Sequence, residues 1–528
     1  MTRTVSATEV KRMLHGGGEL ALLDVREAGQ FGESHLLFAT PLPYSRLELD
    51  IAALAPRKSV RIVLCDDGLL GMAARAAGRL EAQGYTDVSV LEGGTAAWAA
   101  AGYTLYKGVN VPGKLFGELV EHACHTPRVT AQELARMRAA GEDFVVLDGR
   151  PLAEFRKMNI PGGICCPNAE LPYRYSSIVD NPATRIVVNC AGRTRSIIGA
   201  QTLINLGVPN PVVALENGTQ GWVLADFKLE RGASRKYPDT VGAAALPALQ
   251  ASARRLMQRF AVGSITAAKV RGWLHEAGRT TYLCDVRTPE EFAAGSITGA
   301  VHAPGGQLIQ ATDQWIGVRG SRIVLIDGGE NIRAPVVASW LQQLGYESWV
   351  LEGGVRSGLS AGVAASMPRL PALPGIPATQ LKQALDAGRC CVLDLGASME
   401  FRRAHTPGSR WSTRARITAD ARKGEGSIVL VAADPAVARL AAVELFEAGL
   451  TDVKLLDGGV AAWTRSGYAT ASSPADPPDA ECVDYLFFVH DRHAGNREAM
   501  RQYLEWETGL VSQLDEEERA SFRIGPAR

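Results

Sequence analysis

The sequence lacks an excess of charge of either sign. Lys and Arg together number 56, Asp and Glu together also number 56, and the pI is about 7.1. A protein that holds nucleic acid or an anionic membrane through a global basic field carries a clear surplus of positive charge. We therefore expect neither as a partner, although a local basic pocket is compatible with the same totals.

Long apolar runs are also missing. No hydrophobic stretch approaches the ~18–20 residues of a membrane-spanning helix, and residues 1–7 lack the apolar core of a secretory signal. Cysteine is scarce as well, because nine in 528 residues are too few for a disulfide scaffold. These absences favour a cytoplasmic protein with reduced thiols, and they raise the question of whether one of the nine thiols is reactive.

Three signals recur four times in the same order. The first is an apolar segment that ends in Asp and is followed seven residues later by Phe. The second is a short apolar strand that begins at residue 61, 185, 322 or 427. The third is a turn of the type Leu-acidic-Gly-Gly, which begins at residue 91, 215, 351 or 456 and has Asn in place of the first Gly in copy two. Successive copies begin more than a hundred residues apart, so the repeating unit is a whole domain.

Within each copy, short apolar strands alternate with helical stretches such as 73–83, 196–206 and 334–344. Alternation of this kind predicts an α/β fold with parallel strands and crossover helices. We expect four domains, a helical linker over 236–262 and a C-terminal helical tail over 479–528. The predicted domains are 1–107, 126–235, 263–366 and 375–472.

The combination of Asp-x-Arg, a strand that leads into a Cys loop, and Glu-Gly-Gly followed by Trp resembles the rhodanese family of sulfurtransferases. The resemblance covers nearly the whole chain and implies four tandem rhodanese-like domains, each a small parallel sheet flanked by helices. It also implies a reactive Cys at the end of the second strand signal, and no metal or organic cofactor. A fold-level resemblance does not assign a function, which must be argued from a site.

The four copies align without gaps at this strand end. The fourth residue after the strand Ile is Asp66, Cys190, Asp327 or Ala432, so copy two alone places a thiol there. We therefore predict that Cys190 is the catalytic residue and that domains one, three and four are inactive.

The residues after Cys190 support this choice. They form a loop that runs into a helix, and successive backbone N–H groups at such a place bind anions. Positive charge beside the thiol would lower its pKa and ionise the nucleophile. We predict that substrate is bound by Ala191, Gly192, Arg193, Thr194, Arg195 and Ser196. In the resemblance, Arg150, Glu170 and Arg174 are further candidates.

Three alternatives stay open. Phosphatases related to this family use Cys-x5-Arg, but Ser196 stands where that Arg would be, so the shorter loop favours sulfur over phosphate. A longer loop in copy one would make Cys65, one residue before the alignment, the functional thiol. Cys165 and Cys166 are either resolving thiols near the cleft or part of a packed strand, and the packed strand is preferred.

The expected function is transfer of sulfane sulfur through a Cys190 persulfide. The expected partners are a small anionic donor, such as thiosulfate, mercaptopyruvate or glutathione persulfide, and a thiol or cyanide acceptor. The three degenerate domains motivate an alternative, which is a persulfide carrier or scaffold with little turnover of small molecules. The sequence carries no signal for an oligomeric state.

Overall fold

The computed structural model describes residues 2–69, 71–362 and 368–525. It contains four five-stranded sheets, and in each the strand order is first, fifth, fourth, second, third. All pairs of neighbouring strands are parallel. The strands are β1 (Arg3–Val5), β2 (Ala21–Asp24), β3 (Thr40–Pro41), β4 (Ile62–Cys65) and β5 (Val88–Leu91); β6 (Arg128–Val129), β7 (Phe144–Asp148), β8 (Ile164–Cys165), β9 (Arg185–Asn189) and β10 (Val212–Leu215); β11 (Gly263–Ile265), β12 (Thr281–Asp285), β13 (Val301–His302), β14 (Arg322–Ile326) and β15 (Glu347–Leu351); β16 (Gly375–Ile376), β17 (Cys390–Asp394), β18 (Arg410–Trp411), β19 (Ser427–Val431) and β20 (Val453–Leu456).

Helices cover both faces of each sheet, so the predicted α/β architecture is confirmed. The helices that accompany the four sheets are α1 (Ala7–His15), α2 (Ala28–Glu33), α3 (Leu47–Leu54), α4 (Met72–Ala82) and α5 (Gly94–Ala100); α7 (Ala131–Ala139), α8 (Leu152–Lys157), α9 (Leu171–Arg174), α10 (Thr194–Leu206) and α11 (Gly218–Leu224); α13 (Ala267–Leu274), α14 (Pro289–Ala294), α15 (Gly305–Gln310) and α16 (Arg333–Gln343); α17 (Ala378–Asp386), α18 (Ser398–Arg403), α19 (Ile417–Ala421), α20 (Pro435–Glu447) and α21 (Gly459–Arg465). In copy three the segment after the Gly-Gly turn forms only a 3-10 turn, η4 (Gly354–Arg356).

The second sheet shows why its strands read as continuous apolar runs. Leu147, Ile186 and Val188 face α10 on one side, whereas Val146 and Val187 face α7 and α11 on the other. Because side chains alternate across a strand, a sheet covered on both faces needs apolar residues at every position. Burial on both faces therefore holds β9, the strand directly before Cys190, at the centre of domain two.

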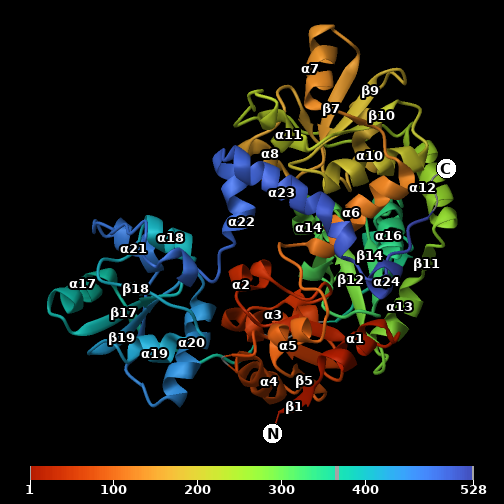
Figure 1. Cartoon of the computed structure of the whole chain (residues 1–528). Coiled ribbons are helices and arrows are strands. Elements are labelled where there is room, and N and C mark those ends of the chain that lie inside the picture. Colours follow the sequence, from red (N-terminus) through yellow and green to blue (C-terminus); the bar gives the residue numbers. More distant parts are fainter. Residues whose placement is uncertain (1, 70, 363–367, 526–528) are drawn as a thin grey trace.

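Five more helices lie outside the four domains: α6 (Val111–Cys124), α12 (Leu246–Arg259), α22 (Phe487–His490), α23 (Arg497–Gly509) and α24 (Glu516–Ala520). Helix α6 joins domains one and two. The C-terminal segment returns across α6, where Leu510 and Val511 pack with Tyr106 and Leu115, and α23 lies beside domain two (Figure 1). The tail therefore reaches the domain that contains Cys190.

The domains are joined by buried polar contacts. Between domains two and three, the indole N–H of Trp340 donates to the hydroxyl of Thr202 at 2.8 Å, and Arg333 pairs with Glu170 at 2.9 Å. Between domains one and four, the hydroxyl of Tyr44 donates to Glu444 at 2.6 Å. Such contacts hold neighbouring domains in one arrangement.

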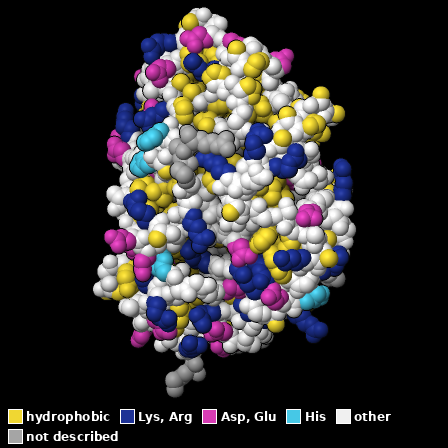
Figure 2. Space-filling view, turned by 90° about the vertical axis from the view of Figure 1, so that its right-hand side faces the viewer, with side chains coloured by type: hydrophobic (Ala, Val, Ile, Leu, Met, Phe, Trp, Pro, Cys, Tyr) yellow, Lys and Arg dark blue, Asp and Glu magenta, His cyan; other side chains and the backbone are white. Residues whose placement is uncertain are grey.

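Basic and acidic side chains are interspersed over the face in Figure 2, which agrees with the balanced totals. Among the described residues, no helix has both the length and the apolar character that crossing a bilayer requires.

Candidate active site

Cys190 lies at the carboxyl end of the central strand β9, where the chain turns into α10. The carboxyl edge of a parallel sheet is where ligands bind in open α/β folds. The Cys190 side chain is buried, with a residue exposure of 2%. The sheet thus holds the thiol at its centre but beneath the surface.

A buried network braces the base of the loop. Arg150 donates to both carboxylate oxygens of Asp148, at 2.8 and 2.7 Å, and to the carbonyl of Met158 at 2.7 Å. The side-chain amide of Asn189, directly before Cys190, donates to Asp148 at 2.7 Å. The same Asp–Arg pair recurs as Asp24 with Arg26 and Asp285 with Arg287. In this structure Arg150 therefore ties strand ends together, and it does not line the cavity beside Cys190.

The third sequence signal holds the carbonyl side of the loop. The Cys190 carbonyl accepts a hydrogen bond from the N–H of Thr219 at 2.9 Å, and the Ala191 carbonyl accepts one from Gln220 at 3.1 Å. Gly218 has φ +51°, and a Cβ there would lie 2.3 Å from the Cys190 carbonyl oxygen. The second glycine of the turn is required because the backbone of α11 approaches the loop this closely.

The N–H side of the same loop has no protein acceptor. Within the described part of the chain, none of the backbone N–H groups of residues 191–195 donates to a protein atom. Unpaired buried N–H groups are rare and costly in folded proteins. A run of five at a helix N-terminus makes a site for an anion.

The matching loops in domains one and three are already filled. The carboxylate of Asp66, in the position of Cys190, accepts from the N–H groups of Gly68 and Ala73, each at 2.8 Å. Asp327 accepts from Gly329 at 2.9 Å, and from residues 332 and 334 at 3.2 and 3.3 Å. In both domains an anionic side chain satisfies the loop, which indicates what the loop of domain two is built to hold.

The two arginines of the loop have different surroundings. Arg195 pairs with Glu154 at 2.8 Å and lies close enough to Cys190 to interact with its charge. Although burial lowers the pKa of Arg195, Glu154, Cys190 and Asp148 raise it above its ordinary value. Arg195 thus stays cationic beside the thiol.

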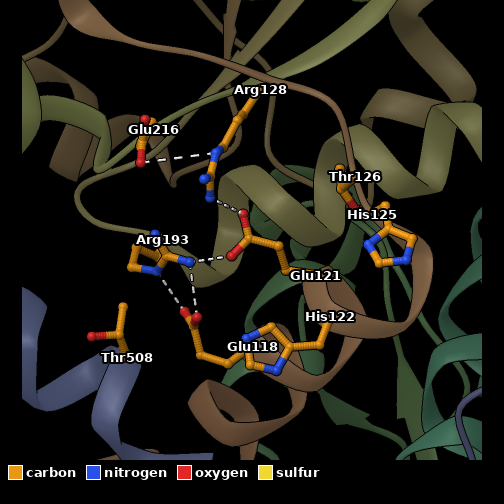
Figure 3. Close-up of a pocket in the computed structure, with 9 residues that line it drawn as sticks. All are labelled: Glu118, Glu121, His122, His125, Thr126, Arg128, Arg193, Glu216 and Thr508. Atoms are coloured by element: carbon orange, nitrogen blue, oxygen red, sulfur yellow. Dashed lines mark hydrogen bonds and ion pairs between the residues drawn. The ribbon is translucent and has the colours of Figure 1, made fainter.

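Arg193 is paired with two carboxylates of α6. Its guanidinium donates to both oxygens of Glu118, at 2.7 and 2.8 Å, and also pairs with Glu121 (Figure 3). Burial raises the pKa of Glu118, and Arg193 opposes that shift. The charge of Arg193 is therefore balanced by Glu118 and Glu121 of α6, a pairing that the loop sequence does not indicate.

Arg193 lines a polar cavity of about 740 Å³, and the residues around this cavity are drawn in Figure 3. Arg128 bridges Glu121 at 3.0 Å and Glu216 at 3.8 Å, and the imidazoles of His122 and His125 lie along the α6 side. Among the described residues, no group of three or more His, Cys, Asp or Glu side chains is placed to hold a metal ion.

A separate cavity of about 30 Å³ lies beside Cys190. Apart from residues 190–195, its lining comes from segments remote in sequence: Lys114 of α6, Gln310 of α15, and Arg492, Tyr503 and Glu507 of the C-terminal segment. Sequence reasoning missed these five residues. The helical pattern of α6 and α23 was visible, but no signal in it indicates that their faces meet over the loop.

The remaining predicted residues lie elsewhere. Glu170 and Arg174 are buried and paired at 3.0 Å, and Glu170 lines a second cavity, of about 300 Å³, between domains two and three. The hydroxyl of Ser196 donates to the Arg193 carbonyl at 2.8 Å. None of these three side chains lines the cavity beside Cys190, so their substrate-binding roles stay predictions.

The other cysteines considered above are poor nucleophiles. Burial raises the pKa of Cys165 to about 12, and it raises the pKa of Cys65 and Cys166 well above the ordinary value. A thiol in this condition stays protonated at neutral pH, and the thiolate is the reactive form.

The chain was compared with known proteins. The family model described as "Rhodanese-like domain" matches residues 6–101, 130–225, 266–361 and 377–466. A crystal structure of a thiosulfate sulfurtransferase from Pseudomonas aeruginosa is 41% identical, with 100% of each chain covered and a TM-score of 0.91. An HTH-type transcriptional regulator of Mycobacterium tuberculosis is 32% identical over 111 residues, which is 21% of this chain. The chain spans about half (48%) of the length of that curated relative.

Proposed function

Because the chain belongs to the rhodanese-like domain family, we propose that it is a sulfurtransferase that carries sulfane sulfur on Cys190. The neighbour of matching length and fold is a thiosulfate sulfurtransferase, which supports an anionic donor of the thiosulfate type. Domains one, three and four are proposed to be inactive because Asp66, Asp327 and Ala432 replace the thiol.

One observation carries the proposal. Equivalent loops of this chain hold a carboxylate in domains one and three, whereas the loop of domain two has a thiol and a run of N–H groups without protein acceptors. A Cys190 thiolate, or the terminal sulfur of its persulfide, supplies the anion that this loop needs. Arg195 adds a cation beside it.

The reaction then has two half-reactions. The Cys190 thiolate attacks the outer sulfur of thiosulfate, the S–S bond of the donor breaks, and its electron pair leaves with sulfite. Cys190 is now a persulfide whose negative terminal sulfur faces the loop. A cyanide ion or a thiolate attacks that sulfur, forms thiocyanate or a new persulfide, and returns the Cys190 thiolate. Atoms and charge balance without an added oxidant or reductant.

The test is turnover of thiosulfate with cyanide and with a thiol by the wild type, Cys190→Ser and the control Cys65→Ser. We expect loss of turnover in Cys190→Ser and near wild-type rates in Cys65→Ser, because Cys65 is buried and protonated. Full activity in Cys190→Ser would overturn the assignment. Persulfide formation without turnover on small acceptors would instead favour the carrier.

A further inference from the structure

The C-terminal segment covers Cys190. Arg492, Tyr503 and Glu507 of this segment line the cavity beside the thiol, and that cavity measures about 30 Å³. This volume holds about one or two groups the size of a water molecule. The outer sulfur of a persulfide fits such a space, whereas thiosulfate, which adds a whole sulfonate group, does not. Seating a donor beside Cys190 therefore requires this space to widen.

Glu507, on α23 of this segment, faces the Cys190 loop. One carboxylate oxygen accepts from the hydroxyl of Thr194 at 2.7 Å and lies 3.4 Å from the ammonium of Lys114. The other, Oε2, is buried and has no hydrogen-bond partner among the described residues. A Cβ built on Gly192 would lie 3.2 Å from Oε2, so this unpartnered oxygen is against the loop.

The surroundings keep this carboxylate ionised. Burial alone would raise the pKa of Glu507, but Lys114, the Thr194 hydroxyl, Arg492 and Arg193 outweigh it and hold the pKa below its ordinary value. An anion is thus already present where the loop and its cations would receive the anionic group of a donor.

The two ends of the cover are held differently. Its C-terminal end is anchored, because Leu510 packs in a buried cluster and Glu518 accepts from the hydroxyl of Tyr106 at 2.6 Å. Near its N-terminal end, Arg497 pairs with Asp226 at 2.7 Å and donates to the carbonyls of Val223 and Leu224 at 3.1 and 2.8 Å. The single side chain of Arg497 makes all three of these contacts, so substitution of this one residue loosens the N-terminal end of the cover.

We propose that the C-terminal segment is a lid over Cys190, and that Glu507 on the lid occupies the position over the loop that the anionic group of the sulfur donor takes. The proposal rests on the proposed function of Cys190 as the sulfur carrier. Donor and lid compete for the loop: the donor displaces Glu507, sulfite leaves, and the lid closes over the persulfide. Glu507 is then a determinant of donor access and specificity.

Alkylation of Cys190 tests the lid without any sulfur transfer. The full-length protein is treated with iodoacetate, which carries a carboxylate, or with neutral iodoacetamide, and the Cys190 peptide is followed by mass spectrometry. In Glu507→Gln we expect the ratio of the iodoacetate rate to the iodoacetamide rate to rise about tenfold, because a charge next to the thiol is removed. The control is Glu505→Gln, an exposed carboxylate on the same helix, which should leave the ratio unchanged.

Arg497→Ala provides the second arm. It removes the contacts that hold the N-terminal end of the lid, so both reagents should react with Cys190 severalfold faster, and because Glu507 moves away with the lid the ratio should also rise. An unchanged ratio in folded Glu507→Gln overturns the anion-site role, and unchanged rates in Arg497→Ala overturn the lid. If Glu507→Gln does not fold, the Arg497→Ala arm alone decides. Retained sulfur transfer in Cys190→Ser would refute the proposed function, while the alkylation rates would still report on the lid.

Discussion

Replacing Gly218 with Ala should disturb the loop that begins at Cys190 more than it disturbs the fold. Gly218 begins α11 with φ +51°, and the new Cβ would lie 2.3 Å from the Cys190 carbonyl oxygen. Real Cβ atoms essentially never lie within 3.0 Å of a non-bonded heavy atom. The carbonyl must therefore retreat by most of an ångström, and it takes the Cys190 loop with it.

The magnitude has two parts. A Cβ in the left-handed region costs about 1–2 kcal/mol, and forcing an atom into a packed site costs about 1–3 kcal/mol more. The rate should suffer further, because a misplacement of about 1 Å in an active site can cost about 100-fold. We expect a modest loss of thermal stability and a loss of roughly 100-fold in kcat/KM for thiosulfate.

Gly207→Ala is the matched control. Gly207 ends α10 with φ +72°, but a Cβ there meets nothing within 4 Å. It shares the strain of positive φ without the contact to the loop. The two variants, compared by thermal unfolding and by thiosulfate turnover, separate the two effects. Equal turnover in both would refute the view that the Gly218 backbone positions Cys190.

Three further predictions concern charge and stability. Asp327→Ala removes the acceptor of three loop N–H groups in domain three. The free energy of unfolding, measured by thermal unfolding, should fall by about 1–3 kcal/mol, while thiosulfate turnover should stay unchanged. A drop in turnover would contradict the proposed inactivity of domain three. Arg193→Met leaves Glu118 buried without its partner and should cost about 3–5 kcal/mol in urea unfolding; recovery in the double variant with Glu118→Met checks the cause. Burial raises the pKa of Asp394 from 3.8 in the unfolded chain to about 6 in the folded protein. The protonated side chain is therefore favoured by folding. Its contribution to the free energy of unfolding is fully present below pH 3.8 and is lost as the pH rises through 6. Asp394→Asn should therefore match the wild type near pH 4 and be more stable near pH 8, by up to about 3 kcal/mol, in urea midpoints; equal midpoints at both pH values would contradict the shift.

The four-domain fold could be predicted because its signals are local and repeated. Strands that are buried on both faces consist of continuous apolar residues. The Gly-Gly turn is needed because the backbone at Gly218 and its equivalents lies against a carbonyl of the neighbouring loop. The position of Cys190 followed from strand register alone. These features depend on residues near each other in the sequence.

The surroundings of Cys190 could not be predicted in the same way. Lys114 and Glu507 meet only because α6 and α23 dock over the loop, and their sequence separation of nearly 400 residues leaves no periodic signal. Glu118, the partner of Arg193, belongs to a connecting helix with no motif, so the sequence does not indicate that this cation is paired. Buried ion pairs between distant elements depend on tertiary packing. The charges along one loop therefore do not reveal which of its side chains are paired.

The location of transferred sulfur tests the central claim most directly. The protein is incubated with thiosulfate, digested without reductant, and its cysteine peptides are examined by mass spectrometry. The account predicts one added sulfur atom on the peptide that contains Cys190 and none on the peptide that contains Cys65. Added sulfur on any other cysteine with Cys190 unmodified, or no added sulfur while thiocyanate is still produced, would contradict it.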